Sequence, residues 1–75
     1  MYSRRTCGLC DRARLVVEIV RGRRDFGFAE VFIDGDEALE REYGLRVPVV
    51  LVDGEEAFEV ELTAEDLEDA LASRA

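Results

Sequence analysis

A helical apolar period occupies the first third of the chain. Between Leu9 and Val20, apolar residues recur every three or four positions, and polar residues take the opposite side. This pattern predicts an amphipathic helix that packs on a sheet and ends near Gly22, with Arg14 and Glu18 paired on its exposed face. Its inward residues are predicted to be Leu9, Ala13, Val16, Val17 and Val20.

Three later segments have the patterns of β-strands. Phe28–Ile33 is rich in β-branched and aromatic residues, and Val47–Val52 is apolar on both faces, as in a central strand covered on both sides. After a turn at Asp53 and Gly54, Ala57–Leu62 alternates, which predicts an edge strand with one exposed face. A turn this short pairs it with Val47–Val52 in a hairpin.

Two further helices are predicted from their caps. Asp36 is placed to cap a short helix that runs to Tyr43, and Gly44 is placed to close it in the left-handed conformation. Thr63 is placed as the N-cap of a last helix. The inward residues of the short helix are predicted to be Ala38, Leu39 and Tyr43, and those of the last helix Ala64, Leu67, Ala70 and Leu71.

The predicted elements form an α/β arrangement. With Tyr2 and Ser3 as the end of a short first strand, their order is strand, helix, strand, helix, strand, strand, helix. We expect the 75 residues to form one domain, 1–75, because of their number. A domain of this size buries only about 60% of its unfolded surface, so its core must be economical.

The charge of the chain argues against two classes of partner. Its formal net charge is −8, whereas nucleic acid and anionic membranes are bound by basic faces, so neither is expected. No segment has the pattern of a membrane helix or a secretion signal, and we expect a cytoplasmic protein and a monomer. Only the N-terminal end is basic, because residues 1–24 hold seven Arg against two acids.

The two cysteines, Cys7 and Cys10, lie where the first strand gives way to the first helix. Cytosolic thiols are kept reduced, so a close pair points to catalysis or metal binding rather than to a structural crosslink. Unpaired amides at a helix start stabilise a thiolate and can lower its pKa from about 8.5 to roughly 3.5–7.5, with Arg4 and Arg5 placed to assist. We expect Cys7 to attack a disulfide and Cys10, which points towards the body, to resolve the mixed disulfide.

Two other interpretations of the pair stay open. The spacing supplies half of many zinc sites, but the chain has no His and no third Cys, so such a site would need carboxylates or a second subunit. We therefore expect no bound metal. The other alternative is a pair of inert buried thiols, because free Cys is common in protein cores.

Pro48 is the only proline and stands at the start of the predicted central strand. Because proline lacks an amide hydrogen, its place there needs a reason. The residues alone favour a trans bond that opens the strand, since only about 5–6% of X–Pro bonds in folded proteins are cis. A cis Val47–Pro48 bond is the alternative.

Four segments together resemble the small glutaredoxin-like proteins of bacteria, over essentially the whole chain. They are Tyr2-Ser3-Arg4, Cys7-Gly8-Leu9-Cys10-Asp11, Tyr43-Gly44-Leu45-Arg46-Val47-Pro48-Val49 and Asp53-Gly54-Glu55. The resemblance implies a thioredoxin-like fold of order βαβαββα, with a four-stranded mixed sheet flanked by helices. It also implies Cys7 as nucleophile, Cys10 as resolving thiol, Pro48 in cis beside them, and a Val47 backbone that pairs with an extended substrate.

The chain departs from this family's pattern where glutaredoxins bind glutathione. Glutaredoxins carry a Gly-Gly dipeptide and an Asp just after the last strand, and here that region reads Val60-Glu61-Leu62-Thr63-Ala64-Glu65-Asp66. Arg4 matches the basic position that binds the glycine carboxylate of glutathione. The resemblance thus implies Arg4 as a substrate-binding residue and glutathione as a candidate co-substrate, with no resident cofactor expected.

The leading hypothesis is a thiol–disulfide oxidoreductase with a redox-active Cys7–Cys10 disulfide. Its partners would be protein or low-molecular-weight disulfides and a thiol reductant that recycles it. An alternative is a binding module of the same fold, whose cysteines turn over too slowly to make it an enzyme. A third hypothesis is an iron–sulfur carrier, in which two chains each give one cysteine and glutathione supplies the remaining ligands.

Overall fold

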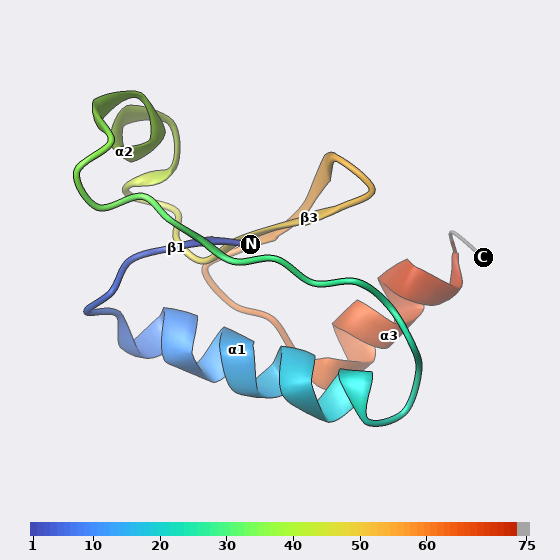
Figure 1. Cartoon of the computed structure of the whole chain (residues 1–75). Helices are drawn as coiled ribbons and strands as arrows, with labels where there is room; N and C mark the ends of the chain where they lie inside the picture. Colours follow the sequence, from blue (N-terminus) through green and yellow to red (C-terminus); the bar gives the residue numbers. More distant parts are fainter. Residues whose placement is uncertain (74–75) are drawn as a thin grey trace.

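The computed structural model describes residues 1–73 as a four-stranded sheet with helices on both of its faces. Helices α1 and α3 lie side by side against one face, and α2 lies on the other side of the sheet (Figure 1). The α/β class and the element order agree with the prediction. The elements are β1 (Tyr2–Ser3), α1 (Gly8–Arg21), β2 (Val31–Phe32), α2 (Glu37–Tyr43), β3 (Val49–Val52), β4 (Glu55–Glu59) and α3 (Ala64–Ala72).

The sheet is mixed and has the strand order β2-β1-β3-β4. Strand β1 runs parallel to β2 and antiparallel to β3, and Tyr2 pairs with Val49. Because β1 and β3 run in opposite directions, the chain that leaves β1 towards Cys7 passes alongside the chain that enters β3 through Pro48. The register of two short strands thus brings the cysteine segment and the proline segment to one end of the sheet.

The strands are shorter than their apolar segments predict. Strand β2 covers only Val31–Phe32 of the predicted Phe28–Ile33, because its one partner, β1, is itself two residues long. Hydrogen bonds extend this pairing slightly, with the amides of Val31 and Ile33 donating to Met1 and Ser3. Strand β3 begins at Val49, directly after the proline. An apolar pattern marks where a strand can form, and the partner sets its length.

The hairpin turns where predicted, but its second strand begins earlier. Asp53 and Gly54 both have positive φ, 52° and 83°, as in the tight type I′ turn that suits a hairpin. Pairing therefore resumes at once, so β4 spans Glu55–Glu59 and not the predicted Ala57–Leu62. A register shift between Val50 and Leu51 marks a bulge in the hairpin. As predicted, β3 is an inner strand and β4 an edge strand.

The main core lies between the sheet, α1 and α3. It is built from Ala13, Val17, Val20, Val50, Leu62 and Leu67. The predicted inward face of α1 is right except at its first residue, because Leu9 is 38% exposed. In its place Cys10, one residue further on, is fully buried. The helix thus turns a cysteine, and not the leucine, towards the core.

Helix α2 has no fully buried residue, and two of its predicted inward residues, Leu39 and Tyr43, are half-buried. Asp36 caps it as predicted, and Tyr43 stacks on Tyr2 with 4.2 Å between the ring centroids. Two predictions about this helix are wrong. Ala38 is exposed, and Gly44 has the right-handed φ of −53°, because its amide continues the helical pattern by donating to Glu40.

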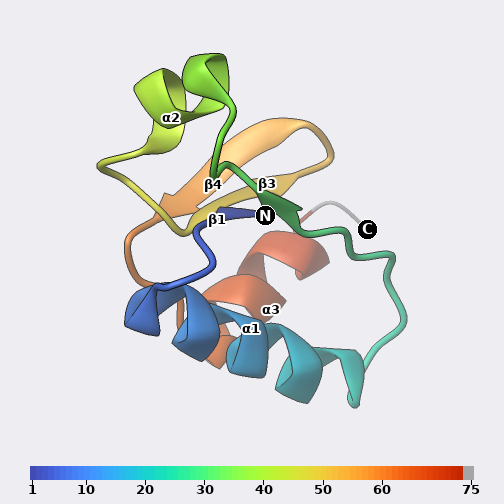
Figure 2. The same ribbon diagram turned by 60° about the vertical axis from the view of Figure 1, so that its left-hand side comes forward.

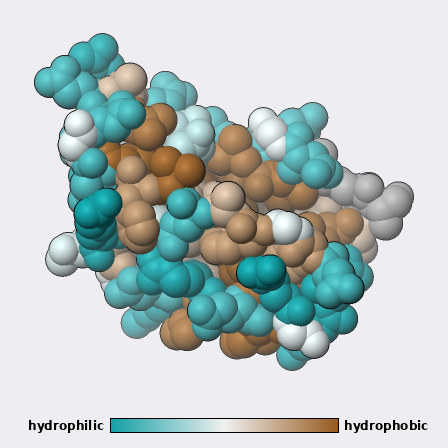
Figure 3. All heavy atoms as spheres, in the orientation of Figure 1, coloured by the Kyte–Doolittle hydropathy of each residue, from teal (hydrophilic) through white to brown (hydrophobic). Residues whose placement is uncertain are grey.

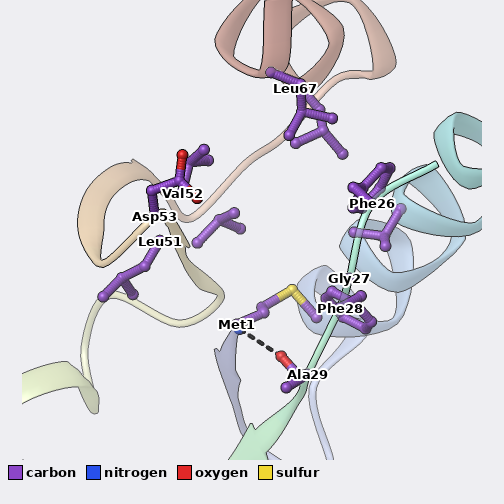
Figure 4. A pocket seen from close by; sticks show the side chains of 12 residues that line it. Met1, Phe26, Gly27, Phe28, Ala29, Leu51, Val52, Asp53 and Leu67 are labelled. Atoms are coloured by element: carbon purple, nitrogen blue, oxygen red, sulfur yellow. Dashed lines mark hydrogen bonds between the residues drawn. The ribbon is translucent and has the colours of Figure 1, made fainter. Parts of the chain in front are cut away.

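A cavity opens on the sheet face between the α1–β2 loop, β3 and α3. It has a volume of about 190 Å³, and its apolar lining includes Met1, Phe26, Phe28, Val52 and Leu67 (Figure 4). Figure 3 shows apolar residues gathered across this side of the molecule. The cavity is lined from the C-terminal end of β3, whereas the cysteine segment adjoins the N-terminal end of β3. Among residues 1–73, no helix has the length and apolar character needed to cross a membrane.

Candidate functional site

Cys7 and Cys10 form a disulfide at the start of α1. Cys7 is the N-cap of the helix, with extended backbone, and its Sγ accepts a hydrogen bond from the amide of Cys10 at 3.1 Å. The carbonyl of Cys7 accepts the first intrahelical bond, from the amide of Asp11. A sulfur thus takes the place that Ser, Thr or Asp usually holds at an N-cap, where unpaired amides favour an acceptor or an anion.

The two sulfurs differ in access. Cys7 is half-buried, whereas Cys10 has no exposed surface and faces the core. Their α-carbons are 5.2 Å apart, one helical turn along the chain. This is the asymmetry predicted from the helix geometry. A substrate in solution can therefore reach the sulfur of Cys7, whereas the sulfur of Cys10 can react only with that of Cys7.

The arginines before the pair have other partners. Arg4 donates to Glu40 at 3.1 Å and, at 3.4 Å, to the carbonyl of Gly44, both in or beside α2. The guanidinium of Arg5 lies over the ring of Phe32 on the edge strand β2, 5.2 Å from the ring centroid. The predicted help from Arg4 and Arg5 is therefore not a direct contact with sulfur. The amide of Cys10, in the first turn of α1, is the donor that the structure shows at the Cys7 sulfur.

The segment before β3 lies next to the site. The Val47–Pro48 peptide bond is cis, Pro48 is buried, and Val47 is half-buried outside any strand. The amide of Val60, beyond the far end of β4, donates to the carbonyls of Arg46 and Pro48 at 3.1 and 2.9 Å. These bonds tie the chain that leaves the hairpin to the proline segment. The backbone of Val47 itself lies between the two bonded carbonyls.

A partly buried ionic network, which the sequence pattern does not indicate, fixes the end of β1 against α1. Ser3 is fully buried and donates to Glu30 at 2.6 Å, and Arg14 donates to both carboxylate oxygens of Glu30 at 2.9 and 2.6 Å. The hydrogen bonds from Arg14 lower the pKa of Glu30. Arg14 also pairs with Asp11, so the predicted pair with Glu18 is wrong.

A groove beside the first turns of α1 is also absent from the prediction. Leu9, Arg12 and Ala13 line it from the helix, and residues 60–63 line it from the segment that follows β4. Figure 2 shows this segment, in orange, passing the start of α1 on its way to α3. The exposed Leu9 is the signal that sequence reasoning missed, because an apolar residue inside a Cys-x-x-Cys motif was assigned to the core.

The structure brings part of the predicted site together. Cys7, Cys10, Val47 and Pro48 lie at one end of the sheet, and Arg4 is next to them on the chain, with its charge paired to α2. Within residues 1–73, no group of three or more Cys, His, Asp or Glu side chains is arranged to hold a metal ion.

Comparison with solved structures gives two close matches, both to one protein. The chain is 40% identical to a Northeast Structural Genomics target protein from X. campestris in its crystal structure, with a TM-score of 0.83, covering 96% of this chain and 92% of that one. For the solution structure of that protein the identity is 39% and the TM-score 0.79, covering 97% of this chain and 90% of that one. A search of curated proteins found no match. The architecture is thus a thioredoxin-like fold.

The comparison with protein families covers nearly the whole chain. Residues 1–72 match the family described as Glutaredoxin-like domain (DUF836). Together with the Cys-x-x-Cys pair at the start of α1, this match supports a redox-type function. The chain belongs to the glutaredoxin-like domain family.

Proposed function

We propose that the protein is a thiol–disulfide oxidoreductase that works through the Cys7–Cys10 dithiol. One observation carries the proposal: an accessible sulfur caps α1 and is disulfide-bonded to a fully buried one. An inert structural bridge would gain little here, because it closes a loop of only a few residues in a helix that is capped and packed already.

The reaction divides between the two sulfurs. The Cys7 thiolate attacks one sulfur of a substrate disulfide, forms a mixed disulfide and releases the other substrate sulfur as a thiolate, which takes up a proton. The Cys10 thiol then loses its proton and attacks the sulfur of Cys7. This step releases the second substrate thiol and forms the Cys7–Cys10 disulfide seen here. Two electrons pass from the dithiol to the substrate, and the reverse sequence oxidises a dithiol.

The neighbouring residues are proposed to hold the substrate. Val47 is outside any strand, and its backbone groups would pair with an extended substrate that lies across the proline segment. Arg4 would bind a substrate carboxylate in competition with Glu40, which now holds its guanidinium. Glutathione is one such carboxylate-bearing thiol and is proposed as a co-substrate, with no resident cofactor.

The proposed setting follows from the chemistry. A disulfide that must be reduced after each turnover needs a thiol reductant, and the cytoplasm maintains such reductants. The partners are then a disulfide-bearing protein or small molecule and the recycling thiol. We propose that the protein acts there as a monomer, without nucleic acid or a membrane.

The test is a pair of single-cysteine variants. In a disulfide reduction assay, Cys7→Ser is expected to lose activity to the background rate, because the accessible nucleophile is gone. Cys10→Ser is expected to accumulate a mixed disulfide with the substrate, since the resolving thiol is missing, and mass spectrometry of the acid-quenched protein would detect it. Full reductase activity in Cys7→Ser would refute the assignment.

A redox titration completes this test. Wild-type protein equilibrated in dithiothreitol buffers and then alkylated is expected to show one two-electron transition between about −270 and −180 mV, the range of cytosolic reductases and exchange catalysts. A pair that stays dithiol at every potential would rule out the dithiol mechanism.

A further inference from the structure

A strained residue lies next to the cysteine site. Val60 has a φ of +69°, a left-handed conformation that a β-branched residue rarely adopts because its Cβ is crowded against the backbone. Within residues 1–73, Asp53 is the one other non-glycine residue with positive φ, and it lies in a hairpin turn that demands this conformation. Val60 instead follows β4 directly, where the hairpin turn places no such demand.

The strain at Val60 is maintained by the proline segment. Its amide donates to the carbonyls of Arg46 and Pro48, and these bonds fix the direction of its side chain. Val60 is 40% exposed and lines the groove along the first turns of α1. A backbone outlier at such a place is a reason to look for function, because the strain persists only where the surroundings hold it.

The groove has the size and the lining for one apolar side chain. Its volume is about 160 Å³, and its apolar members are Leu9, Ala13, Val60 and Leu62. An apolar cavity of about 150 Å³ in another protein accepts benzene, so a leucine or phenylalanine side chain is a suitable occupant. The groove begins at Leu9, two residues after Cys7, so a residue adjacent to a disulfide under attack by Cys7 can reach it.

The charges at the groove do not select one sign of partner. Arg12 and Glu61 line it with opposite charges, and Arg12 is exposed and forms no ion pair with any described residue. The apolar lining is therefore the feature that selects the occupant.

On the basis of the proposed function, we propose that Val60 is a specificity-determining residue. Its side chain forms the apolar wall of a groove that receives an apolar side chain adjacent to the disulfide of a protein substrate. A valine held in a glycine-type conformation narrows the groove for this contact. Removing the wall with Val60→Gly keeps the backbone conformation, which glycine adopts freely, and removes only the apolar surface.

The experiment compares two synthetic peptide disulfides that differ in one residue. In one peptide a leucine is adjacent to the cysteine, and in the other a serine takes its place. Wild-type protein is expected to reduce the leucine peptide with a kcat/KM about tenfold higher, the size of effect that one apolar group has in a pocket. In Val60→Gly the ratio of the two kcat/KM values is expected to fall to about one.

Asp53→Gly is the matched control. This substitution relieves the backbone strain at the other non-glycine residue with positive φ, at the far end of the hairpin. If relief of strain alone changed specificity, the ratio of the two kcat/KM values would change in Asp53→Gly as well. The expected ratio for Asp53→Gly is that of the wild type. Thermal unfolding of each variant verifies that it is folded before the ratios are compared.

The outcomes separate the inference from the proposed function. Equal rates for the two peptides with wild-type protein, or a tenfold ratio that persists in Val60→Gly, would overturn the role of Val60 and leave the oxidoreductase intact. If wild-type protein reduces neither peptide and also fails on a small hydrophilic disulfide, the proposed function fails and the role of Val60 fails with it.

Discussion

Gly44 is needed for space rather than for its conformational freedom. A glycine after a helix is usually read as a left-handed cap, yet the φ here is −53°, which any residue adopts. A Cβ at this position would meet the carbonyl oxygen of Glu40 and lie 2.7 Å from a guanidinium nitrogen of Arg4. The same guanidinium bonds to Glu40 and to the Gly44 carbonyl. The close approach of Arg4 to α2 thus depends on the missing side chain.

Gly44→Ala is therefore expected to destabilise the fold. The added methyl must push away backbone atoms of α2 and Arg4, and overpacking of this kind costs about 1–3 kcal/mol. Urea denaturation would measure the loss. Gly27→Ala is the matched control, because nothing lies within 4 Å of a Cβ there and its φ is not positive. A loss for Gly44→Ala no larger than that for Gly27→Ala would contradict the steric explanation.

Among the elements, α2 is attached differently from the others. It contributes no buried residue, and its links to the sheet are the Tyr2–Tyr43 stack, the Arg4–Glu40 pair and the contacts of Arg46. Arg46 follows the helix, donates to the carbonyl of Glu42 at its end and pairs with Glu56 and Glu59 on β4. All of these ion pairs are partly exposed, so salt weakens them.

Salt is accordingly expected to loosen α2 before it affects α1. At about 1 M salt the screening length falls to roughly 3 Å, which is comparable to the lengths of these ion pairs. Hydrogen exchange followed by mass spectrometry or NMR should show the α2 amides exchanging several-fold faster at high salt, with those of α1 unchanged. The core contacts of α1 at Val17 and Val20 provide the internal control. Equal acceleration in the two helices would show that α2 is held by more than charge.

At the scale of the whole molecule, the network of Ser3, Glu30 and Arg14 joins three parts of the chain. It connects β1, the segment before β2 and α1, and so fixes where the helix that carries the cysteines meets the sheet. The pKa of Glu30 is lowered below its usual value of 4.5, chiefly by its hydrogen bonds from Arg14. The folded state thus favours the charged carboxylate.

The sign of the pH dependence follows from this shift. A carboxyl whose folded pKa lies below its unfolded value adds stability above the unfolded pKa and loses it as pH falls through the folded pKa. The free energy of unfolding is expected to decline as pH falls below about 4.5. Glu30→Gln is expected to be less stable at pH 7 by about 2 kcal/mol, the range for hydrogen bonds to charged groups, and to show a shallower acid decline.

Chemical denaturation of both proteins between pH 7 and pH 3 would measure this effect. Glu18→Gln is the control, since Glu18 is exposed and does not take part in the network. If Glu30→Gln follows the same acid decline as wild type, the network does not account for the acid sensitivity.

Structural features that depend on a few neighbouring residues are predicted well from the sequence. The caps at Asp36 and Thr63, the helix at the cysteines and the hairpin turn each depend on a few neighbouring residues, and all are present. Strand ends depend on a distant partner, which is why β2 is shorter than its predicted segment and β4 begins and ends earlier than predicted. The partner of Arg14 was missed for the same reason, because Glu30 lies sixteen residues away. The left-handed conformation of Val60 has no signal in a single sequence.

The two edge strands of the sheet determine how readily the chain pairs with other copies of itself. An edge strand has unpaired amides and carbonyls that can pair with a strand of another molecule, and such pairing begins fibril growth. Strand β2 is only two residues long, and β4 carries Glu55, Glu56 and Glu59 along its length. A neighbouring copy would therefore find β2 too short to extend. At β4 it would bring its own glutamates against those of this chain, and like charges repel. We therefore expect the sheet edges to add few further strands, whereas the end of the sheet with the disulfide is open to other proteins.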